Sequence, residues 1–235
     1  MPRFFYHFLF LISLTSFSST AQDTILNKYG LWVIGSVNTY KKTILSDRDK
    51  IMVALSVEIP YAVFDLRYSS RDNFTHTKLY PDISTTYMRL DASEKLSAVQ
   101  GELIHQRLGI KIWDAYRPYS VTEKMWELVK DERYAANPRS GSGHNRGVAV
   151  DLTIIDMDTG KELDMGTGFD NFTDTAHHDF KNLPEQVLKN RALLRSIMEK
   201  HGFVALETEW WHYYLPDFKK YELLDLSFEE LYKIQ

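Results

Sequence analysis

The chain of 235 residues is long enough for one large domain or two small ones. Hydrophobic residues make up 44% of the sequence and charged residues 26%, which excludes a disordered, collagenous or coiled-coil protein. The net charge of -4 and the isoelectric point of about 6.1 argue against nucleic acid as a partner, because nucleic-acid-binding proteins usually carry a basic face. Cysteine is absent from the sequence, so disulfides, thiolate metal ligands and a cysteine nucleophile are excluded.

The N-terminal segment has the pattern of a secretory signal peptide. Arg3 precedes a mostly apolar run over residues 4–17, which is shorter than the ~20 residues that a membrane span needs. Ser19 and Ala21 then supply the small residues of a cleavage site. We therefore expect a signal peptide over residues 1–21, a mature chain without a membrane span, and export to the periplasm. An uncleaved anchor or a buried N-terminal helix is the alternative.

The rest of the chain is expected to form an N-terminal extension over residues 22–55 and one domain over residues 56–235. Hydrophobic periodicity predicts the following elements. The strands are 62–68, 110–115 and 148–155, with an extended aromatic segment at 203–215. The helices are 92–108, capped by Asp91 and ended by Gly109; 122–134, capped by Ser120 or Thr122; and 184–201, opened by Pro184 and ended by Gly202. Helices and strands mix without a regular βαβ alternation, which favours an α+β fold, and we expect a central, mainly antiparallel sheet flanked by helices.

Three residues in two segments have the composition of a zinc site. His144 and Asp151 belong to one segment and His212 to the other, and two imidazoles with one carboxylate leave a fourth position open, as in catalytic zinc sites. Asp151 lies inside a predicted buried strand, where a charge is costly unless it is paired or bound to metal. The alternative is that His144 lies in a surface loop and that Asp151 pairs with Arg146.

Glu209 precedes His212 by three residues. On a regular strand these two side chains would point to opposite faces, so a shared site requires a twist, a bulge or a strand end between them. A carboxylate beside a metal-bound water is a candidate general base. We expect Trp210 and Trp211 to form the wall of the pocket and to exclude water. The alternative is a buried aromatic strand in which the glutamate and the histidine have no joint role.

Arg117 follows the predicted strand at 110–115, and Pro118 restricts the backbone after it. A cation at the end of a strand can stabilise the oxyanion of a tetrahedral intermediate. Arg117 can equally serve as a structural partner of Asp114.

Several ordered blocks of the sequence resemble one known family, the zinc D-alanyl-D-alanine dipeptidases. The blocks are Asp65-Leu66-Arg67-Tyr68 with Asp72-Asn73-Phe74, Asp114-Ala115-Tyr116-Arg117-Pro118, Ser142-x-His144-x-Arg146-Gly147-x-Ala149-x-Asp151-Leu152-Thr153, Met165-Gly166-Thr167-Gly168-Phe169-Asp170, Asn190-Arg191 through Arg195-Ser196-Ile197-Met198, and Glu209-Trp210-Trp211-His212-Tyr213. They span most of the chain after the first 64 residues. The paired tryptophans and the Phe-Asp block distinguish the dipeptidases from other zinc DD-peptidases.

The resemblance implies the zinc DD-peptidase (hedgehog-like) fold and hydrolysis of a small D,D-dipeptide, D-alanyl-D-alanine. It implies one zinc ion per chain. The implied roles are as follows: zinc ligands His144, Asp151 and His212; activation of the water by Glu209; stabilisation of the oxyanion by Arg117; binding of the free ammonium by Tyr68 and Asp170; and binding of the free carboxylate by Ser142.

Two other functions remain open at this point. One is a different zinc peptidase of the cell wall, a DD-carboxypeptidase or an endopeptidase, which would need an open cleft able to pass a polymer. The other is a non-catalytic, zinc-stabilised wall-binding protein. Glu209 and Arg117 argue against the second, because binding alone requires neither.

Overall fold

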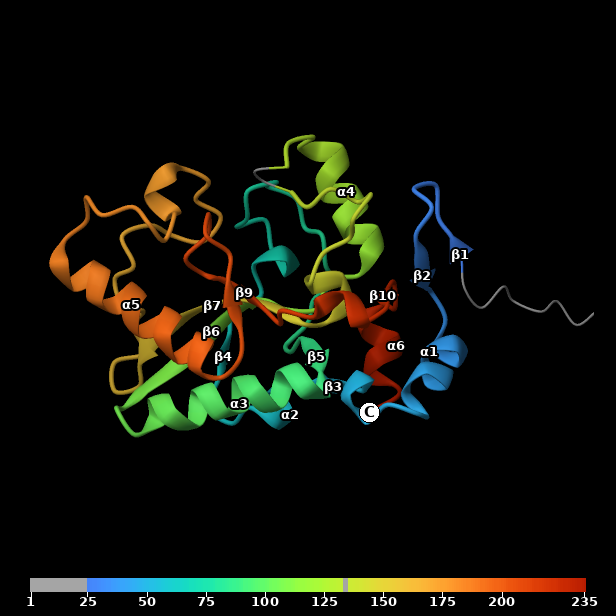
Figure 1. The fold of residues 1–235 in the computed structure, drawn as a ribbon, viewed down its shortest axis with the longest axis horizontal. Coiled ribbons are helices and arrows are strands. Elements are labelled where there is room, and N and C mark those ends of the chain that lie inside the picture. Colours follow the sequence, from blue (N-terminus) through green and yellow to red (C-terminus); the bar gives the residue numbers. More distant parts are fainter. Residues whose placement is uncertain (1–24, 133–134) are drawn as a thin grey trace, which may run out of the picture.

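The computed structural model describes residues 25–132 and 135–235. The expected signal peptide, with its cleavage after Ala21, lies outside the described residues. The described chain forms a central sheet between helices, and the N-terminal segment packs at one end of the molecule (Figure 1). Helices combined with a mainly antiparallel sheet confirm the α+β class that the sequence predicts.

The central sheet has five strands in the order β4-β6-β7-β9-β8. β4 runs parallel to β6, and the other neighbours are antiparallel. The strands are β4 (Val63–Phe64), β6 (Leu108–Asp114), β7 (Ala149–Asp156), β8 (Val204–Ala205) and β9 (His212–Tyr214). All of β7 except its last residue is buried, because this strand is covered on both faces.

Two long helices, α3 (Leu90–Ile104) and α5 (Glu185–Lys200), cover one face of the central sheet. They share a hydrophobic cluster with alternate residues of β6 and β7. The members that show this pattern are Leu96, Val99, Leu103, Leu194, Ile197, Met198, Ile110, Ile112, Leu152 and Ile154. The spacing of three or four residues on the helices and two on the strands brings these side chains to one interface.

A second hydrophobic cluster, rich in tyrosine, joins α4 (Tyr119–Leu128) and the C-terminal helix α6 (Phe228–Tyr232) to residues of the N-terminal segment. In Figure 1, α3 and α4 lie on opposite sides of the sheet. The Tyr116 hydroxyl, just after β6, donates to the carbonyl oxygen of Leu226 at 2.8 Å. This bond ties the end of β6 to the C-terminal segment.

The N-terminal segment joins the rest of the molecule through two small sheets. β2 pairs with β1 and with the C-terminal strand β10, and β3 pairs with β5. The fully buried Arg89 of β5 donates from its guanidinium to the carbonyl oxygens of Lys50, Arg146 and Glu222. The elements are β1 (Ile25–Leu26), β2 (Trp32–Ile34), α1 (Val37–Ile44), β3 (Met52–Ala54), α2 (Leu55–Glu58), β5 (Tyr87–Arg89) and β10 (Leu223–Leu224). The division between an extension and a domain at residue 55 stays a prediction.

Five single turns of 3-10 helix complete the described structure. They are η1 (Arg48–Lys50), η2 (Arg67–Ser69), η3 (His144–Arg146), η4 (Asp174–Ala176) and η5 (Phe218–Lys220). Among the helices of the described residues, none combines the length and the apolar character that crossing a bilayer requires.

The predicted helix 92–108 is displaced in the structure, where α3 ends at Ile104. Asp91 does not cap it: it lies in the first turn, and its carboxylate accepts hydrogen bonds from Lys95 and from the Tyr221 hydroxyl. Arg107 adopts a φ of 58°, which turns the chain and lets β6 begin at once. Gly109 therefore lies inside β6 and does not end the helix.

The predicted strand 62–68 is only two residues long, because η2 turns the chain back at Arg67. The predicted helix 122–134 instead runs over Tyr119–Leu128, and neither Ser120 nor Thr122 caps it. Asp225, distant in sequence, accepts the backbone N–H of Ser120 at 2.8 Å and supplies that cap.

The C-terminal predictions match the structure more closely. α5 begins directly after Pro184, and Gly202 ends it with a φ of 89°, as expected. The extended segment 203–215 is broken by a turn into β8 and β9.

Candidate active site

Three acidic and basic side chains lie in one row across the central sheet. Asp151 of β7 pairs in register with Asp114 of β6 on one side and with His212 of β9 on the other. Register partners in antiparallel strands point to the same face, so these three side chains share the face opposite α3 and α5. Asp114 and Asp151 are almost completely buried. The row therefore places charged groups inside the protein, where each charge must be paired, hydrogen-bonded or bound to a metal.

A β-bulge at Trp113 places Asp114 in this row. Ile112 pairs with Leu152 and Asp114 pairs with Asp151, so Trp113 is an extra residue on β6. Regular alternation would have put Asp114 on the same face as Ile112, in the hydrophobic cluster. The bulge turns its carboxylate toward Asp151.

His144 reaches the row from η3, in the loop before β7. It is 3% exposed, so it is not a surface loop residue. Its Nδ1 lies 2.7 Å from the carbonyl oxygen of Ala115, which can only accept, so Nδ1 donates and Nε2 is left with a lone pair. Gly147 ends the turn with a φ of 71° and allows the chain to enter β7. Arg146 donates to the Tyr221 carbonyl instead of pairing with Asp151.

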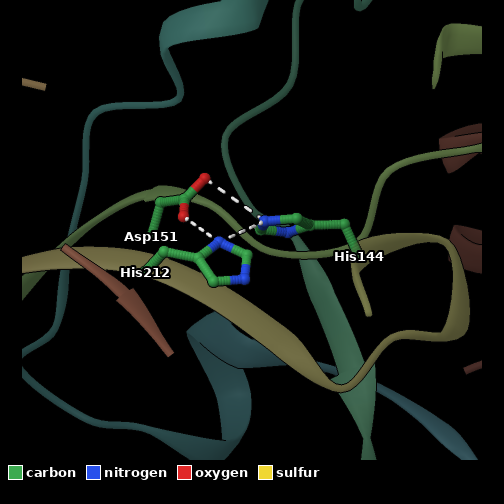
Figure 2. A group of neighbouring side chains, drawn as sticks. All are labelled: His144, Asp151 and His212. Carbon is green, nitrogen blue, oxygen red and sulfur yellow. Dashed lines mark hydrogen bonds and ion pairs between the residues drawn. The ribbon is translucent and has the colours of Figure 1, made fainter. Parts of the chain in front are cut away.

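His144, Asp151 and His212 converge on one point (Figure 2). His144 Nε2 lies 3.3 Å from Asp151 Oδ2 and 3.2 Å from His212 Nδ1, and the latter lies 2.9 Å from Asp151 Oδ1. Ligand atoms at ~2.0–2.1 Å from a tetrahedral zinc ion lie ~3.3 Å apart. The described residues thus offer two imidazole nitrogens and one carboxylate with the spacing of a three-ligand metal site.

The carboxylate of Asp151 electrostatically supports this trio. Burial opposes its ionisation, but the two histidines outweigh burial and hold the pKa of Asp151 below its ordinary value. Burial likewise opposes a charge on His212, but the hydrogen bond that His212 donates to the Asp151 carboxylate raises the pKa of His212 overall. A divalent cation bound between this carboxylate and the two imidazoles would take the place of the proton that they share, because metal binding releases protons from its ligands.

Glu209 lies in the turn that leads into β9. His212 N–H donates to the Glu209 carbonyl oxygen at 3.2 Å, and β9 begins only at His212. This strand end is how the two side chains come to the same site. A Glu209 carboxylate oxygen lies 4.0 Å from His212 Nδ1. Burial, reinforced by Asp151 and opposed by His212, raises the pKa of Glu209 to about 7, which suits a group that exchanges protons near neutral pH.

Arg117 is oriented by Asp114 from the strand row. Its Nε and Nη2 both donate to Asp114 Oδ2, at 3.0 and 2.8 Å, while the Tyr80 hydroxyl donates to Asp114 Oδ1 at 2.8 Å. Arg117 Nη2 also lies 3.9 Å from Asp151 Oδ2. Burial works against the charge of Arg117, but Asp114 outweighs burial, and the pKa of Arg117 lies well above its ordinary value. Arg117 is therefore a fixed cation beside the candidate metal site. It is at the same time the structural partner of Asp114 that the sequence suggests.

Tyr68 and Asp170 meet on another side of the site. The Tyr68 hydroxyl donates to Asp170 Oδ1 at 3.1 Å, and the guanidinium of Arg117 lies over the Tyr68 ring, 5.1 Å from its centre. Asp170 has a φ of 56°, an unusual backbone conformation for a residue with a side chain. Burial, together with the charge of Asp151, raises the pKa of Asp170 to about 8. Tyr68 reaches this position from η2, not from the strand predicted for it.

All eight predicted site residues line one pocket of about 190 Å³. Sequence reasoning missed five further residues of its lining, which are Glu132, Ala135, Ala136, Phe172 and Leu206. These residues carry no motif of their own, and only the fold brings them here. Gly143 also lines the pocket, and a side chain does not fit at this position, because a Cβ would lie 2.8 Å from the Cβ of Ala149.

The two tryptophans differ in their positions. Trp211 lines the pocket, as predicted. Trp210 does not: it lies in the hydrophobic cluster and donates from Nε1 to Thr167 Oγ1 at 2.7 Å. The two tryptophans lie in the turn before β9, and their ring planes are nearly perpendicular, at 89°.

Comparison with known proteins identifies relatives over most of the chain. Residues 48–231 match the family model described as D-ala-D-ala dipeptidase. A D-alanyl-D-alanine dipeptidase of Escherichia coli (strain K12) is 35% identical over 74% of this chain and 89% of the relative. One from Enterococcus faecium is 33% identical over 68% of this chain and 89% of the relative. A solved LD-carboxypeptidase structure covers 87% of this chain and 90% of its own at 16% identity, with a TM-score of 0.43, which is too low to support an argument.

Proposed function

The chain belongs to the D-Ala-D-Ala dipeptidase family of metallopeptidases, and from this premise we propose that it hydrolyses the dipeptide D-alanyl-D-alanine to two D-alanines with the help of zinc. The observation that carries the proposal is the single pocket of about 190 Å³ that combines a metal-ligand trio, a carboxylate, a cation and groups for both ends of a dipeptide.

His144, Asp151 and His212 would hold the metal, one ion per chain. A zinc ion bound there would polarise the scissile carbonyl and lower the pKa of a water toward ~7. The hydrogen bond from His144 Nδ1 to the Ala115 carbonyl orients that ring so that its Nε2 faces the site.

Glu209 would move the protons of the reaction. As the water oxygen attacks the carbonyl carbon, the Glu209 carboxylate accepts one of its protons. When the C–N bond breaks, Glu209 returns this proton to the leaving nitrogen, so that one water is consumed and two amino acids are released. The pKa of about 7 at Glu209 lets the same group act as base and then as acid.

Arg117 would stabilise the negative charge that develops on the carbonyl oxygen. Asp114 accepts hydrogen bonds from its Nε and Nη2, which holds the guanidinium in a fixed orientation beside the site. A donor fixed before the reaction is effective because it needs no reorganisation as charge develops.

The selection of a dipeptide would rest on its two charged ends. Asp170, together with Tyr68, would bind the free ammonium, and Ser142 would bind the free carboxylate. The pocket is smaller than the ~300–1,000 Å³ typical of sites for larger ligands, which favours a dipeptide over a cell-wall polymer. We also propose export to the periplasm with cleavage after Ala21, on the basis of the apolar run that precedes it.

The direct test is to incubate metal-loaded protein with D-Ala-D-Ala, L-Ala-L-Ala and a cell-wall pentapeptide and to measure the alanine that is released. We expect release from D-Ala-D-Ala alone. Release from the pentapeptide with none from the dipeptide would replace the proposal with a carboxypeptidase.

A further inference from the structure

The side chain of Asn145 lies directly behind the pocket and is completely buried. Its Nδ2 donates to the carbonyl oxygen of Arg117 at 2.9 Å and to Thr122 Oγ1 at 2.8 Å. Its Oδ1 accepts from the backbone N–H of Ser142 at 3.0 Å and from the Ser142 hydroxyl at 3.1 Å. The amide therefore uses its full capacity of two donated and two accepted hydrogen bonds.

These bonds join two segments that meet only in the fold. Arg117 follows β6, whereas Ser142 lies in the loop before β7. The two segments are also held by Arg117 N–H, which donates to the His144 carbonyl at 3.2 Å, and by His144 Nδ1, which donates to the Ala115 carbonyl. Both of these bonds connect the segment after β6 to His144 and not to Ser142. Asn145 alone links Arg117 to Ser142 among the hydrogen bonds of the described residues.

We propose that Asn145 is a positioning residue that sets the distance between the oxyanion donor Arg117 and the carboxylate-binding Ser142, and so selects substrates whose free carboxylate directly follows the scissile bond. This inference rests on the roles given to Arg117 and Ser142 in the proposed function. When substrate binds, the Ser142 hydroxyl would turn its single proton from Asn145 Oδ1 to the carboxylate, while the Ser142 backbone N–H stays bonded to Asn145 Oδ1 and the Asn145 backbone N–H to the Ser142 hydroxyl oxygen. In a dipeptide the carbonyl and the terminal carboxylate are separated by one residue, so a shift of Ser142 against Arg117 loses one contact or the other. A side-chain amide is suited to the task because, among uncharged side chains, only those of asparagine and glutamine donate twice and accept twice.

The test compares two substrates that differ only at the carboxylate: D-Ala-D-Ala and its C-terminal amide, D-alanyl-D-alaninamide. The measured quantity is the preference, defined as kcat/KM for the dipeptide divided by kcat/KM for the amide. In Asn145→Ala we expect the preference to fall ~10-fold or more, the worth of one hydrogen bond to a charged group. A loss of general stability would lower both rates together and leave the preference unchanged, so an unchanged preference overturns the inference.

Asn190 offers a matched control. It too is a buried asparagine whose Nδ2 donates to a backbone carbonyl, that of Asp164 at 2.8 Å, and whose Oδ1 accepts from Gln186, but it lies on α5 and outside the pocket. Asn190→Ala should lower the melting temperature while the preference stays that of the original protein. If Asn145→Ala does not fold, Asn145→Ser serves in its place, since a hydroxyl restores one donor and part of the acceptor, and we expect a smaller fall in the preference.

A binding measurement separates this inference from the proposed function. Calorimetry of the metal-loaded Glu209→Ala protein gives Kd for D-Ala-D-Ala and for the amide without turnover, and the same ratio is then measured with Asn145→Ala added. If the original protein hydrolyses neither substrate, the proposed function fails, and the inference stands only if Asn145→Ala still lowers the ratio of affinities. Equal affinity for the dipeptide and the amide before the Asn145 change would overturn it.

Discussion

The residues of the pocket lie in two kinds of structural setting. Asp151 and His212 lie in register on neighbouring strands, and Asp114 continues the row on a third strand. Ser142, Glu209 and the other groups around them lie on turns and loops. The strands place side chains through backbone pairing, whereas each loop residue depends on a particular hydrogen bond or ion pair for its orientation.

This difference suggests a division of work. The strand row supplies two of the three candidate metal ligands, and the loops supply the groups that would contact the substrate. His144 bridges the two settings, because it lies in a loop but is locked to the Ala115 carbonyl. Changes in the row should therefore remove the metal, and changes in the loops should spare the metal and impair catalysis.

Loss of a strand ligand should have the most severe consequence. His212→Ala removes one of three ligands, so we expect the purified variant to contain little zinc and to have no measurable dipeptidase activity. Metal analysis and hydrolysis of D-Ala-D-Ala on the same preparation check this. His105→Ala, in an exposed histidine after α3, should keep one zinc per chain. Full zinc occupancy in His212→Ala would remove His212 from the ligand set.

Substitution of the proposed general base should impair catalysis without removing the metal. Glu209→Ala should retain zinc and lose ~10²–10⁴-fold or more in kcat, since the same group serves in both proton transfers. Glu207 provides the control: it lies two residues away, is exposed and pairs with Arg195, so Glu207→Ala should keep its activity. If Glu209→Ala retains zinc and turns over dipeptide within a few fold of the original protein, Glu209 is not the base.

Arg117→Ala should also retain zinc, with kcat reduced ~10²–10³-fold by loss of the donor to the oxyanion. The variant leaves Asp114 buried without its cation, so its melting temperature should fall as well. Arg107→Ala, which removes an exposed ion pair with Asp158, should change neither quantity much. Loss of zinc in Arg117→Ala at a normal melting temperature would contradict the division between strand and loop residues.

The sequence predicts which residues belong to the site better than it predicts the contacts that hold them in place. The eight candidate residues do lie in one pocket, and the buried strand around Asp151 and the helix before Gly202 are close to their predicted bounds. The strand, the helix end and the candidate ligands, base and cation could be argued from local patterns of the sequence, whereas Tyr68, Ser142 and Asp170 were implied only by the resemblance to the dipeptidase family.

The features that escaped prediction depend on contacts between distant segments. The bulge at Trp113 is an irregularity of pairing between two strands and leaves no mark on either one alone. Asp225 caps α4 from more than a hundred residues away, and Tyr80 reaches Asp114 from another loop. Contacts of this kind determine where loop residues lie. The spacing of residues along the sequence therefore does not predict which side chains a loop residue contacts.

Binding of the substrate ammonium should depend on pH through Asp170, a loop residue. Burial raises the pKa of Asp170 to about 8, so below that pH the empty pocket holds a neutral carboxyl that must lose its proton to face an ammonium. The cost of this proton loss decreases as pH rises, so the contribution of Asp170 to kcat/KM should increase from pH 6 to pH 8.

Asp170→Asn tests this directly. The variant cannot ionise at position 170, so the ratio of kcat/KM in the original protein to that in Asp170→Asn should be small at pH 6 and grow by up to ~10-fold per pH unit toward pH 8. Any titration of Glu209 is common to both proteins and largely cancels in the ratio. The raised pKa also means that the contribution of Asp170 to the free energy of unfolding decreases as pH rises from about 4 to about 8, and Asp170→Asn should remove this contribution from the pH dependence of urea unfolding. A ratio of kcat/KM that stays constant from pH 6 to pH 8 would show that Asp170 does not bind the ammonium as a carboxylate.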